Sequence, residues 1–172
     1  LRRAMSRTAA VRVGRLEVFW SLPSTNTALL ERAAPTDGCY DVLLVEHQSG
    51  GRGRRGRTWL APLGGSLCFS VSMRFAESPP GLSALPLCVR VSILESLQRA
   101  GATGLALNWP NDLVTADGRG KLGGMLTELR AEAGGPAQVV VGVGLNLRLP
   151  PGARSAIERL GTRAADLATL GL

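Results

Sequence analysis

Hydrophobic and polar positions along the chain predict a series of short β-strands. Within residues 16–20, apolar residues alternate with polar ones, as in a strand with one buried face. Residues 41–47 form an apolar run typical of a buried strand. Four further strands are predicted over residues 66–74, 105–108, 121–130 and 138–147. The pair Asp117-Gly118, which lies between two of these strands, is typical of a β-hairpin turn.

Helical spacing is found in fewer places. Ser24 and Thr25 can cap a short helix that continues through residues 28–30. The longest helix is expected within residues 82–100, where four apolar residues recur at helical spacing: Leu87, Val91, Leu94 and Leu97. Gly101 is a suitable helix stop. An alanine-rich segment at 163–170 looks like the start of another helix.

Strands outnumber helices in this pattern, and their close spacing favours antiparallel pairing. The predicted fold class is therefore α+β: a mixed, largely antiparallel sheet with helices packed on one side. No internal repeat or linker divides the chain. Residues 1–14 are basic and lack an apolar pattern, so we expect them to be the remains of a linker. Residues 15–172 are expected to form one domain.

Composition narrows the class of protein. The chain has 172 residues, of which 45% are hydrophobic and 19% charged, which excludes global disorder. The longest uncharged run, 58–73, is too short to span a bilayer, and no apolar signal-peptide segment follows the basic start. The cysteines are odd in number and widely spaced (Cys39, Cys68 and Cys88). We therefore expect free thiols in a reducing cytoplasm, without disulfides or a zinc site.

The positive charge is local. The net charge is +7, and every basic residue except Lys121 and the single histidine is an arginine. Nine arginines lie in residues 1–16 and 52–57, and without them the rest of the chain has a net charge of −2. Two local clusters indicate an anion site more than the broad basic face of a nucleic-acid-binding protein.

The first motif is the segment Gly-Arg-Gly-Arg-Arg-Gly-Arg-Thr-Trp at 51–59, directly after a predicted strand. Alternate glycines allow the backbone to wrap closely around a ligand, and four crowded arginines favour an anion as partner. Its spacing matches neither a Walker loop nor a dinucleotide fingerprint. The same composition also fits a solvated basic loop or an Arg-Gly nucleic-acid tract.

Two further segments contain candidate chemistry. Asn108-Trp109-Pro110-Asn111-Asp112 is predicted to expose polar side chains at the end of a strand, although an ordinary turn has the same composition. Lys121, which begins the segment Lys-Leu-Gly-Gly-Met-Leu, is the one lysine in an arginine-rich chain. Lys121 can be a functional residue, because a compact ammonium can approach two convergent oxygens. The alternative is that it is a chance surface lysine. His47 stands alone and is interpreted as a packed residue, since no catalytic triad or metal-ligand spacing is present.

Together these segments resemble the catalytic domain of bacterial biotin protein ligases. The similar motifs occur in the same order over about residues 16–150: Ser24-Thr25-Asn26, Glu46-His47-Gln48, the 51–57 loop, Trp109-Pro110-Asn111-Asp112, Lys121-Leu122-Gly123-Gly124 and the strand 139–146. The resemblance implies the class II aminoacyl-tRNA synthetase/biotin ligase fold. It also implies a two-step reaction, in which biotin and MgATP give biotinyl-5′-AMP, which then acylates a lysine of a biotin carboxyl carrier protein.

The resemblance also implies roles for individual residues. Catalysis would fall to Lys121 and Arg54. The biotin site would comprise Ser24, Thr25, Asn26, Gln48, Arg52, Gly53, Arg54, Lys121, Gly123 and Gly124, with Gly142 beside the bicyclic ring. The nucleotide site would comprise Arg54, Arg57, Trp59, Asn111 and Asp112. The resemblance does not assign residues as metal ligands. The implied location is cytoplasmic, and the implied partners are a carrier domain and, in some members, a second copy of the chain, with no membrane and no specific DNA.

Two departures from the family pattern leave alternatives open. Asn108 stands where the family usually has a lysine, and neither the family's small C-terminal domain nor the helix-turn-helix of its repressor-type members is expected within the chain. A degenerate homologue that binds biotin without full ligase activity is therefore one alternative. A lipoate ligase of the same superfamily is a second, and a nucleic-acid-binding protein that uses the Arg-Gly loop is a third.

Overall fold

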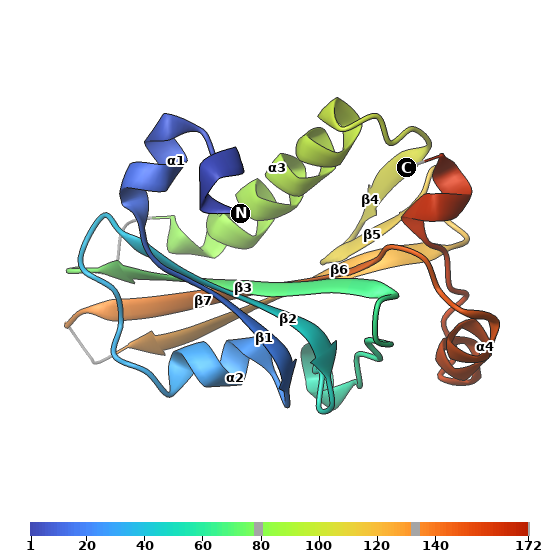
Figure 1. Ribbon diagram of the computed structural model, residues 1–172, viewed down its shortest axis with the longest axis horizontal. Helices are drawn as coiled ribbons and strands as arrows, with labels where there is room; N and C mark the ends of the chain where they lie inside the picture. Colours follow the sequence, from blue (N-terminus) through green and yellow to red (C-terminus); the bar gives the residue numbers. More distant parts are fainter. Residues whose placement is uncertain (78–80, 132–134, 172) are drawn as a thin grey trace.

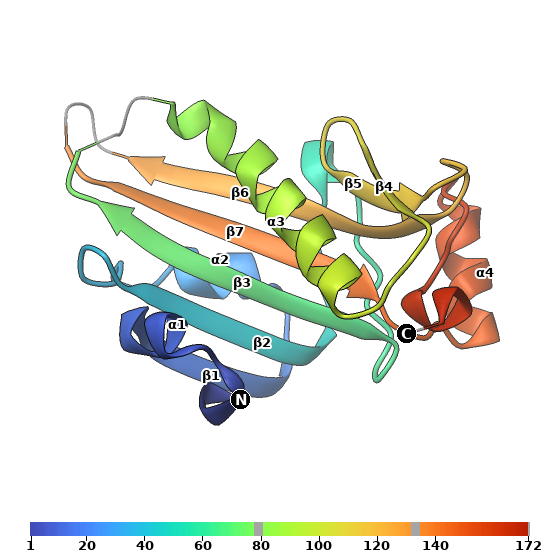
Figure 2. The same cartoon turned by 90° about the horizontal axis from the view of Figure 1, so that it is seen from above.

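Seven strands form a single sheet in the computed structural model, which describes residues 1–77, 81–131 and 135–171. The strands are β1 (Val13–Leu22), β2 (Tyr40–Gln48), β3 (Ser66–Phe75), β4 (Leu105–Asn108), β5 (Asp112–Thr115), β6 (Lys121–Ala131) and β7 (Ala137–Asn146). Their order across the sheet is β1-β2-β3-β7-β6-β5-β4 (Figure 2). β1 runs parallel to β2, and the other neighbouring pairs are antiparallel. The α+β fold class and the largely antiparallel sheet are confirmed.

Helices lie on both faces of this sheet. They are α1 (Arg7–Arg12), α2 (Thr25–Leu30), α3 (Leu85–Arg99) and α4 (Pro151–Arg159), with 3₁₀ turns η1 (Arg2–Ala4), η2 (Arg54–Gly56), η3 (Leu82–Ala84) and η4 (Leu167–Leu170). α3 crosses one face and α2 packs against the opposite one (Figure 1). The expectation that helices pack on one side is therefore wrong in this respect.

The reason lies in the alternation along the central strands. In β7, Val139, Val141 and Val143 face α3 in the larger apolar cluster, together with Leu122 and Leu113. The intervening Val140 joins Leu43 and Leu29 in a second cluster beneath α2. Because β7 is buried on both faces, the sheet needs a helix on each side.

Two segments differ from the sequence-based expectation. β5 was not predicted, because Asn111-Asp112 was interpreted as part of a turn. The Asp117-Gly118 turn is present, but it joins β5 to β6, and Gly118 has a positive φ of 72°. Residues 1–14, expected to be a linker remnant, contain η1, α1 and the start of β1, where Val13 is buried.

The alanine-rich segment at 163–170 does not form the expected helix: residues 163–166 are extended, and residues 167–170 form the 3₁₀ turn η4. Ala164 pairs with Lys121 as an isolated parallel bridge, and the Ala165 amide donates to the Lys121 carbonyl at 2.9 Å. Asp166 is 2% exposed and accepts hydrogen bonds from the Leu149 amide and from Arg154. Because these partners keep residues 163–166 extended, helical structure begins only at Leu167, with the 3₁₀ turn η4.

No helix in the described ranges is long and apolar enough to cross a membrane.

The three cysteines are free, and their environments differ. Cys88 is exposed on α3, whereas Cys68 is buried in β3, and burial raises the pKa of its thiol to about 11. We therefore expect iodoacetamide at pH 8 to alkylate Cys88 at least tenfold faster than Cys68, because the thiolate is the reactive form. Peptide mass spectrometry over a time course measures both rates, and denaturant should remove the difference. Equal rates in the folded protein would contradict the burial of Cys68.

Candidate active site

A cleft of about 980 Å³ lies on the face of the sheet that carries α2. Its walls come from six parts of the chain: the end of β2 at Gln48, the start of α2, the loop 52–60, the turn 108–112, the strands β6 and β7, and the end of α4 with the residues that follow it to Thr162. The sheet register brings these parts together although they are up to about 140 residues apart in sequence.

Small residues of β7, namely Gly142 and Gly144, line the floor of the cleft, and small residues of the neighbouring β3 lie beside them. On the α2 face, β3 presents Ser66, Cys68, Ser70 and Ser72 opposite Asn146, Gly144, Gly142 and Val140 of β7. A β-carbon on Gly142 would lie 2.2 Å from Asn26 Oδ1, and one on Gly144 would lie 2.5 Å from the Trp59 ring. The two glycines therefore allow Asn26 and Trp59 to lie directly on the sheet.

One end of the cleft is lined by uncharged polar groups. Ser24 caps α2 by accepting a hydrogen bond from the Thr27 amide, which leaves Thr25 and Asn26 in the first turn. Gln48, at the end of β2, accepts a hydrogen bond from the Thr25 amide at 2.9 Å. Ser24, Thr25 and Asn26 are each less than a tenth exposed. This end can donate and accept hydrogen bonds without adding charge.

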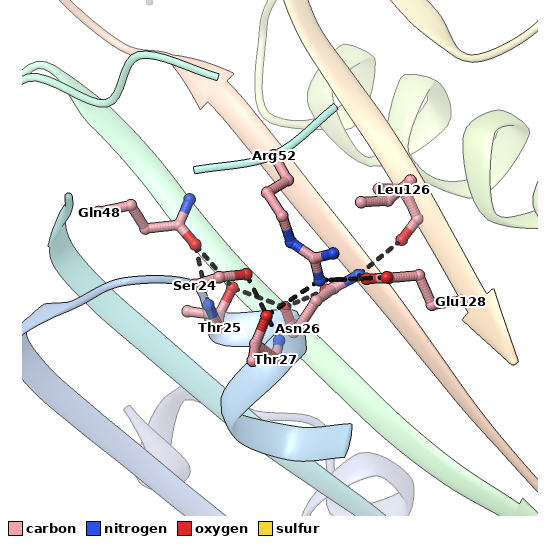
Figure 3. Close-up of polar contacts among 9 residues, drawn as sticks. Ser24, Thr25, Asn26, Thr27, Gln48, Arg52, Leu126 and Glu128 are labelled. Atoms are coloured by element: carbon pink, nitrogen blue, oxygen red, sulfur yellow. Dashed lines mark hydrogen bonds and ion pairs between the residues drawn. The ribbon is translucent and has the colours of Figure 1, made fainter. Parts of the chain in front are cut away.

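Asn26 joins this polar end to β6 (Figure 3). Its Nδ2 donates to the Leu126 carbonyl at 3.1 Å and to Glu128 Oε2 at 2.7 Å. Its Oδ1 lies 2.6 Å from Ser70 Oγ. Because protein groups occupy both ends of the amide, Asn26 is a support for the polar end more than a free ligand contact.

The Arg-Gly loop folds back on itself. The Trp59 amide donates to the Gly51 carbonyl, the Gly53 amide donates to the Arg57 carbonyl, and η2 forms the tip. A β-carbon on Gly51 would lie 2.4 Å from the Trp59 carbonyl oxygen, so glycine is required at that crossing. This fold directs the arginine side chains of the loop toward the cleft, which all four line.

Two of these arginines contact opposite walls. Arg54 Nη1 donates to Asn111 Oδ1 at 3.2 Å. Arg52 Nη2 donates to Thr27 Oγ1 and lies 3.1 Å from both oxygens of Glu128. The loop therefore spans the cleft between α2 and the 108–112 turn.

Lys121 lines the cleft beside Asp112 and Trp59. Its Nζ is 2.8 Å from Asp112 Oδ1 and 6.0 Å from the centre of the Trp59 ring. Both charged side chains are about one quarter exposed. The extended segment at 163–165 forms backbone hydrogen bonds with Lys121. These bonds fix the backbone from which the Lys121 side chain extends.

The cleft has a strong excess of positive charge. Among the residues that the structure describes, five cationic ones line the cleft, against one carboxylate, that of Asp112. Such an arrangement can bring two anions together and stabilise negative charge as it develops between them. Within the described residues, no group of three or more His, Cys, Asp and Glu side chains could hold a metal ion. His47 bonds Ser21 and does not line the cleft.

The sequence-predicted site residues lie together in this cleft, with one exception. Gly123 points to the α3 face, where a β-carbon would lie 2.6 Å from both the Gly144 carbonyl oxygen and the Leu145 side chain. Its assignment to the biotin site is therefore not supported by its placement. Sequence reasoning missed Ser70, Gly144, Asn146 and Glu128. The alternation of small and large residues in β3 and β7 is the signal that could have found the first three.

Asn108 also lines the cleft, directly opposite Asp112 on the neighbouring strand. The next residue, Trp109, is 79% exposed, and the guanidinium of Arg90 from α3 lies 5.1 Å from the centre of its ring. Arg90 itself is 4% exposed. The turn therefore lies between two cations, Arg90 on one side and Arg54 on the other.

Comparison with known proteins defines the class. The sequence model of the biotin/lipoate A/B protein ligase family matches residues 18–146, which is most of the chain. The chain belongs to this family.

Two curated relatives have similar sequences. The bifunctional ligase/repressor BirA of Escherichia coli is 37% identical over 136 residues, which cover 79% of this chain and 41% of that protein. The biotin–[acetyl-CoA-carboxylase] ligase of Mycobacterium tuberculosis is 38% identical over 164 residues, or 91% of this chain and 56% of that protein. The chain thus spans about half the length of the curated relatives it matches.

Solved structures agree with this assignment. The biotin protein ligase of Aquifex aeolicus in complex with biotin and ATP has a TM-score of 0.67 and 30% identity, covering 92% of this chain and 62% of that one. A lipoate-protein ligase A bound with ATP has a TM-score of 0.64 at 12% identity, covering 93% of this chain and 77% of that one. The second likeness concerns the fold alone.

Proposed function

We propose that this chain is the catalytic domain of an ATP-dependent biotin protein ligase. It would form biotinyl-5′-AMP and transfer biotin to a lysine of a biotin carboxyl carrier protein. The observation that carries the proposal is one cleft that combines uncharged polar side chains at the start of α2 with a cationic set made of the loop arginines and Lys121. One relative of similar sequence is named a biotin–[acetyl-CoA-carboxylase] ligase and another a bifunctional ligase/repressor, which supports the same activity.

The polar end fits the ureido ring of biotin. A ureido group has two N–H donors and one carbonyl acceptor and no charge. Thr25 and Gln48 supply hydroxyl and amide groups of both kinds at this end. The dithiolane ring of lipoate would leave these buried groups without partners, which costs free energy. This contrast is why biotin is favoured over lipoate as substrate.

The cationic end fits the reacting groups. A biotin carboxylate oxygen would attack the α-phosphorus of ATP, forming the acyl-phosphate bond as the bond to pyrophosphate breaks. Lys121 would hold the carboxylate and the developing charge on the α-phosphate, and Arg54 would hold the phosphate from the loop side. Arg57, Trp59, Asn111 and Asp112 would contact the rest of the nucleotide. In the second step the carrier lysine amine attacks the acyl carbon, AMP leaves, and the amine loses its proton.

ATP reaches such sites as its magnesium complex. Asp112 forms an ion pair with Lys121 through its Oδ1, and it is the one carboxylate among the described residues that line the cleft. Magnesium needs few protein ligands when phosphates supply the others, so the residues present fit a metal bound mainly through the phosphates, with Asp112 as its protein ligand. ATP use, a protein substrate and free thiols together favour a cytoplasmic location.

The deciding experiment is biotin-dependent exchange of pyrophosphate into ATP by the purified chain. The proposal requires exchange with biotin and little or none with lipoate. Exchange with lipoate alone would identify a lipoate ligase. Biotin binding by calorimetry without any exchange would identify a degenerate homologue. Salt-sensitive retention on RNA that biotinyl-adenylate does not displace would favour a nucleic-acid-binding role.

We expect Asn108→Lys to raise the rate of adenylate formation several-fold and to leave biotin affinity nearly unchanged. Residue 108 lies opposite Asp112, within reach of a lysine ammonium. The new cation would share Asp112 with Lys121 and add positive charge beside the phosphates. Exchange kinetics and calorimetry measure the two effects. A variant no faster than the parent would indicate that Arg54 or Arg90 already supplies this charge.

A further inference from the structure

We propose that Glu128 is a positioning residue, which fixes the direction of the hydrogen bonds at the polar end of the cleft and ties Arg52 to them. This inference rests on the proposed function, because it concerns recognition of the ureido ring. Glu128 lies on β6 opposite Val140, on the same face as Gly124 and Leu126, and its side chain is 24% exposed.

The first step concerns the orientation of the Asn26 amide. An ionised carboxylate only accepts hydrogen bonds, and so does a backbone carbonyl. Glu128 Oε2 and the Leu126 carbonyl, at 2.7 and 3.1 Å, therefore require the NH₂ group of Asn26 on their side. The Asn26 oxygen is then directed at Ser70, whose Oγ is 2.6 Å away. Glu128, by the shorter of these two contacts, and the Leu126 carbonyl together remove the usual ambiguity of a buried amide.

The second step follows the hydroxyl hydrogens. Ser70 Oγ has one hydrogen, which the Asn26 oxygen takes. Thr25 Oγ1 lies 2.6 Å from Ser70 Oγ and 3.2 Å from Gln48 Oε1, and because Ser70 has no second hydrogen to give, the Thr25 hydroxyl donates in the shorter contact. The lone pairs of Thr25 are then free to accept from a ligand N–H. Gln48 uses its Oε1 on the Thr25 amide, so its NH₂ group is left to donate to a ligand carbonyl.

The third step concerns the loop. Arg52 Nη2 lies 3.1 Å from both Glu128 oxygens and donates to Thr27 at 2.9 Å (Figure 3). The same carboxylate therefore contacts Asn26 beneath the cleft and Arg52 above it. Glu128 therefore holds two things in place. One is the set of hydrogen bonds that would recognise the ureido ring, and the other is the loop that would cover this ring.

The test is Glu128→Gln, which keeps the shape of the side chain. Glutamine turns one acceptor oxygen into an NH₂ donor, and this donor must face either Asn26 or Arg52, which are themselves donors. We expect the KM for biotin in pyrophosphate exchange to rise about tenfold, with the KM for ATP unchanged. Glu95→Gln on the exposed surface of α3 is the matched control and should behave as the parent.

A second measurement needs no ligand. Hydrogen exchange of residues 51–57 in the free protein should be about threefold faster in Glu128→Gln than in the parent, because an exposed ion pair stabilises the loop modestly. Arg52→Gln, which changes an exposed side chain, should speed exchange equally, and the double variant should add little more.

These measurements separate the two proposals. A parent chain that does not use biotin would overturn the proposed function and, with it, the ureido role of Glu128, whatever the loop exchange shows. If the parent uses biotin but Glu128→Gln has an unchanged biotin KM, the inference is wrong. Equal increases in both KM values would indicate a general structural role and would also overturn it. Should Glu128→Gln fail to fold, unchanged loop exchange in Arg52→Gln would overturn it, and threefold faster exchange would support it.

Discussion

Lys121→Ala is expected to lower the rate of adenylate formation by about 10²–10³-fold, the usual cost of removing one preorganised charge from such a site. The ammonium lies 2.8 Å from Asp112 and above the Trp59 ring, at the cationic end of the cleft. Without it, Asp112 loses its ion-pair partner, and the two reacting anions lose the cation that offsets their mutual repulsion. Pyrophosphate exchange measures the loss, and calorimetry should find biotin binding much less affected.

The control for this prediction is Arg119→Ala. Arg119 lies in the turn before β6, close to Lys121 in sequence but outside the cleft, and it is largely exposed. This variant tests whether removing any nearby positive charge slows the reaction through a long-range electrostatic effect. We expect near-parental exchange from this variant. If Lys121→Ala turned over at the parental rate, Lys121 would have no part in the chemistry.

The strands that could be predicted are those with a clear apolar signal. Six strands were expected, and all six are found within a few residues of their expected ranges: β1, β2, β3, β4, β6 and β7. β5 could not be predicted, because its first residue, Asp112, favours a turn locally. The segment becomes a strand because it pairs with both β4 and β6. The segment 163–166 is extended for the same reason: its backbone bonds to Lys121 in another strand and to the Arg154 side chain of α4, and neither contact can be read from the local pattern.

The candidate site divides in a similar way. Residues with unusual local chemistry, such as the arginines of the loop and Lys121, could be found from the sequence. Glu128 could not, because a glutamate near the end of a strand has no distinctive local pattern. Its importance comes from Asn26 and Arg52, which are 102 and 76 residues away. Gly123 was placed in the site by its motif, whereas the period-2 alternation of the strand directs it to the other face.

Gly142→Ala is the second change with a large expected effect. The new β-carbon would lie 2.2 Å from Asn26 Oδ1 and 2.9 Å from its Cγ, in a side chain that is 3% exposed. Asn26 cannot move away without losing its hydrogen bonds to Leu126, Glu128 and Ser70. Overpacking of this kind costs about 1–3 kcal/mol. We therefore expect biotin affinity to fall by one to two orders of magnitude and the melting temperature by several degrees.

The expected loss is specific to the polar end, and two variants test this. Gly152→Ala in α4 adds a β-carbon that meets nothing within 4 Å, so it should bind biotin as the parent does. Gly144→Ala meets the Trp59 ring instead of Asn26, so it should slow adenylate formation more than it weakens biotin binding. Calorimetry with biotin and pyrophosphate exchange separate the two effects. Parental biotin affinity in Gly142→Ala would mean that Asn26 can leave its place without cost, and the polar end would then not depend on the packing of α2 against β7.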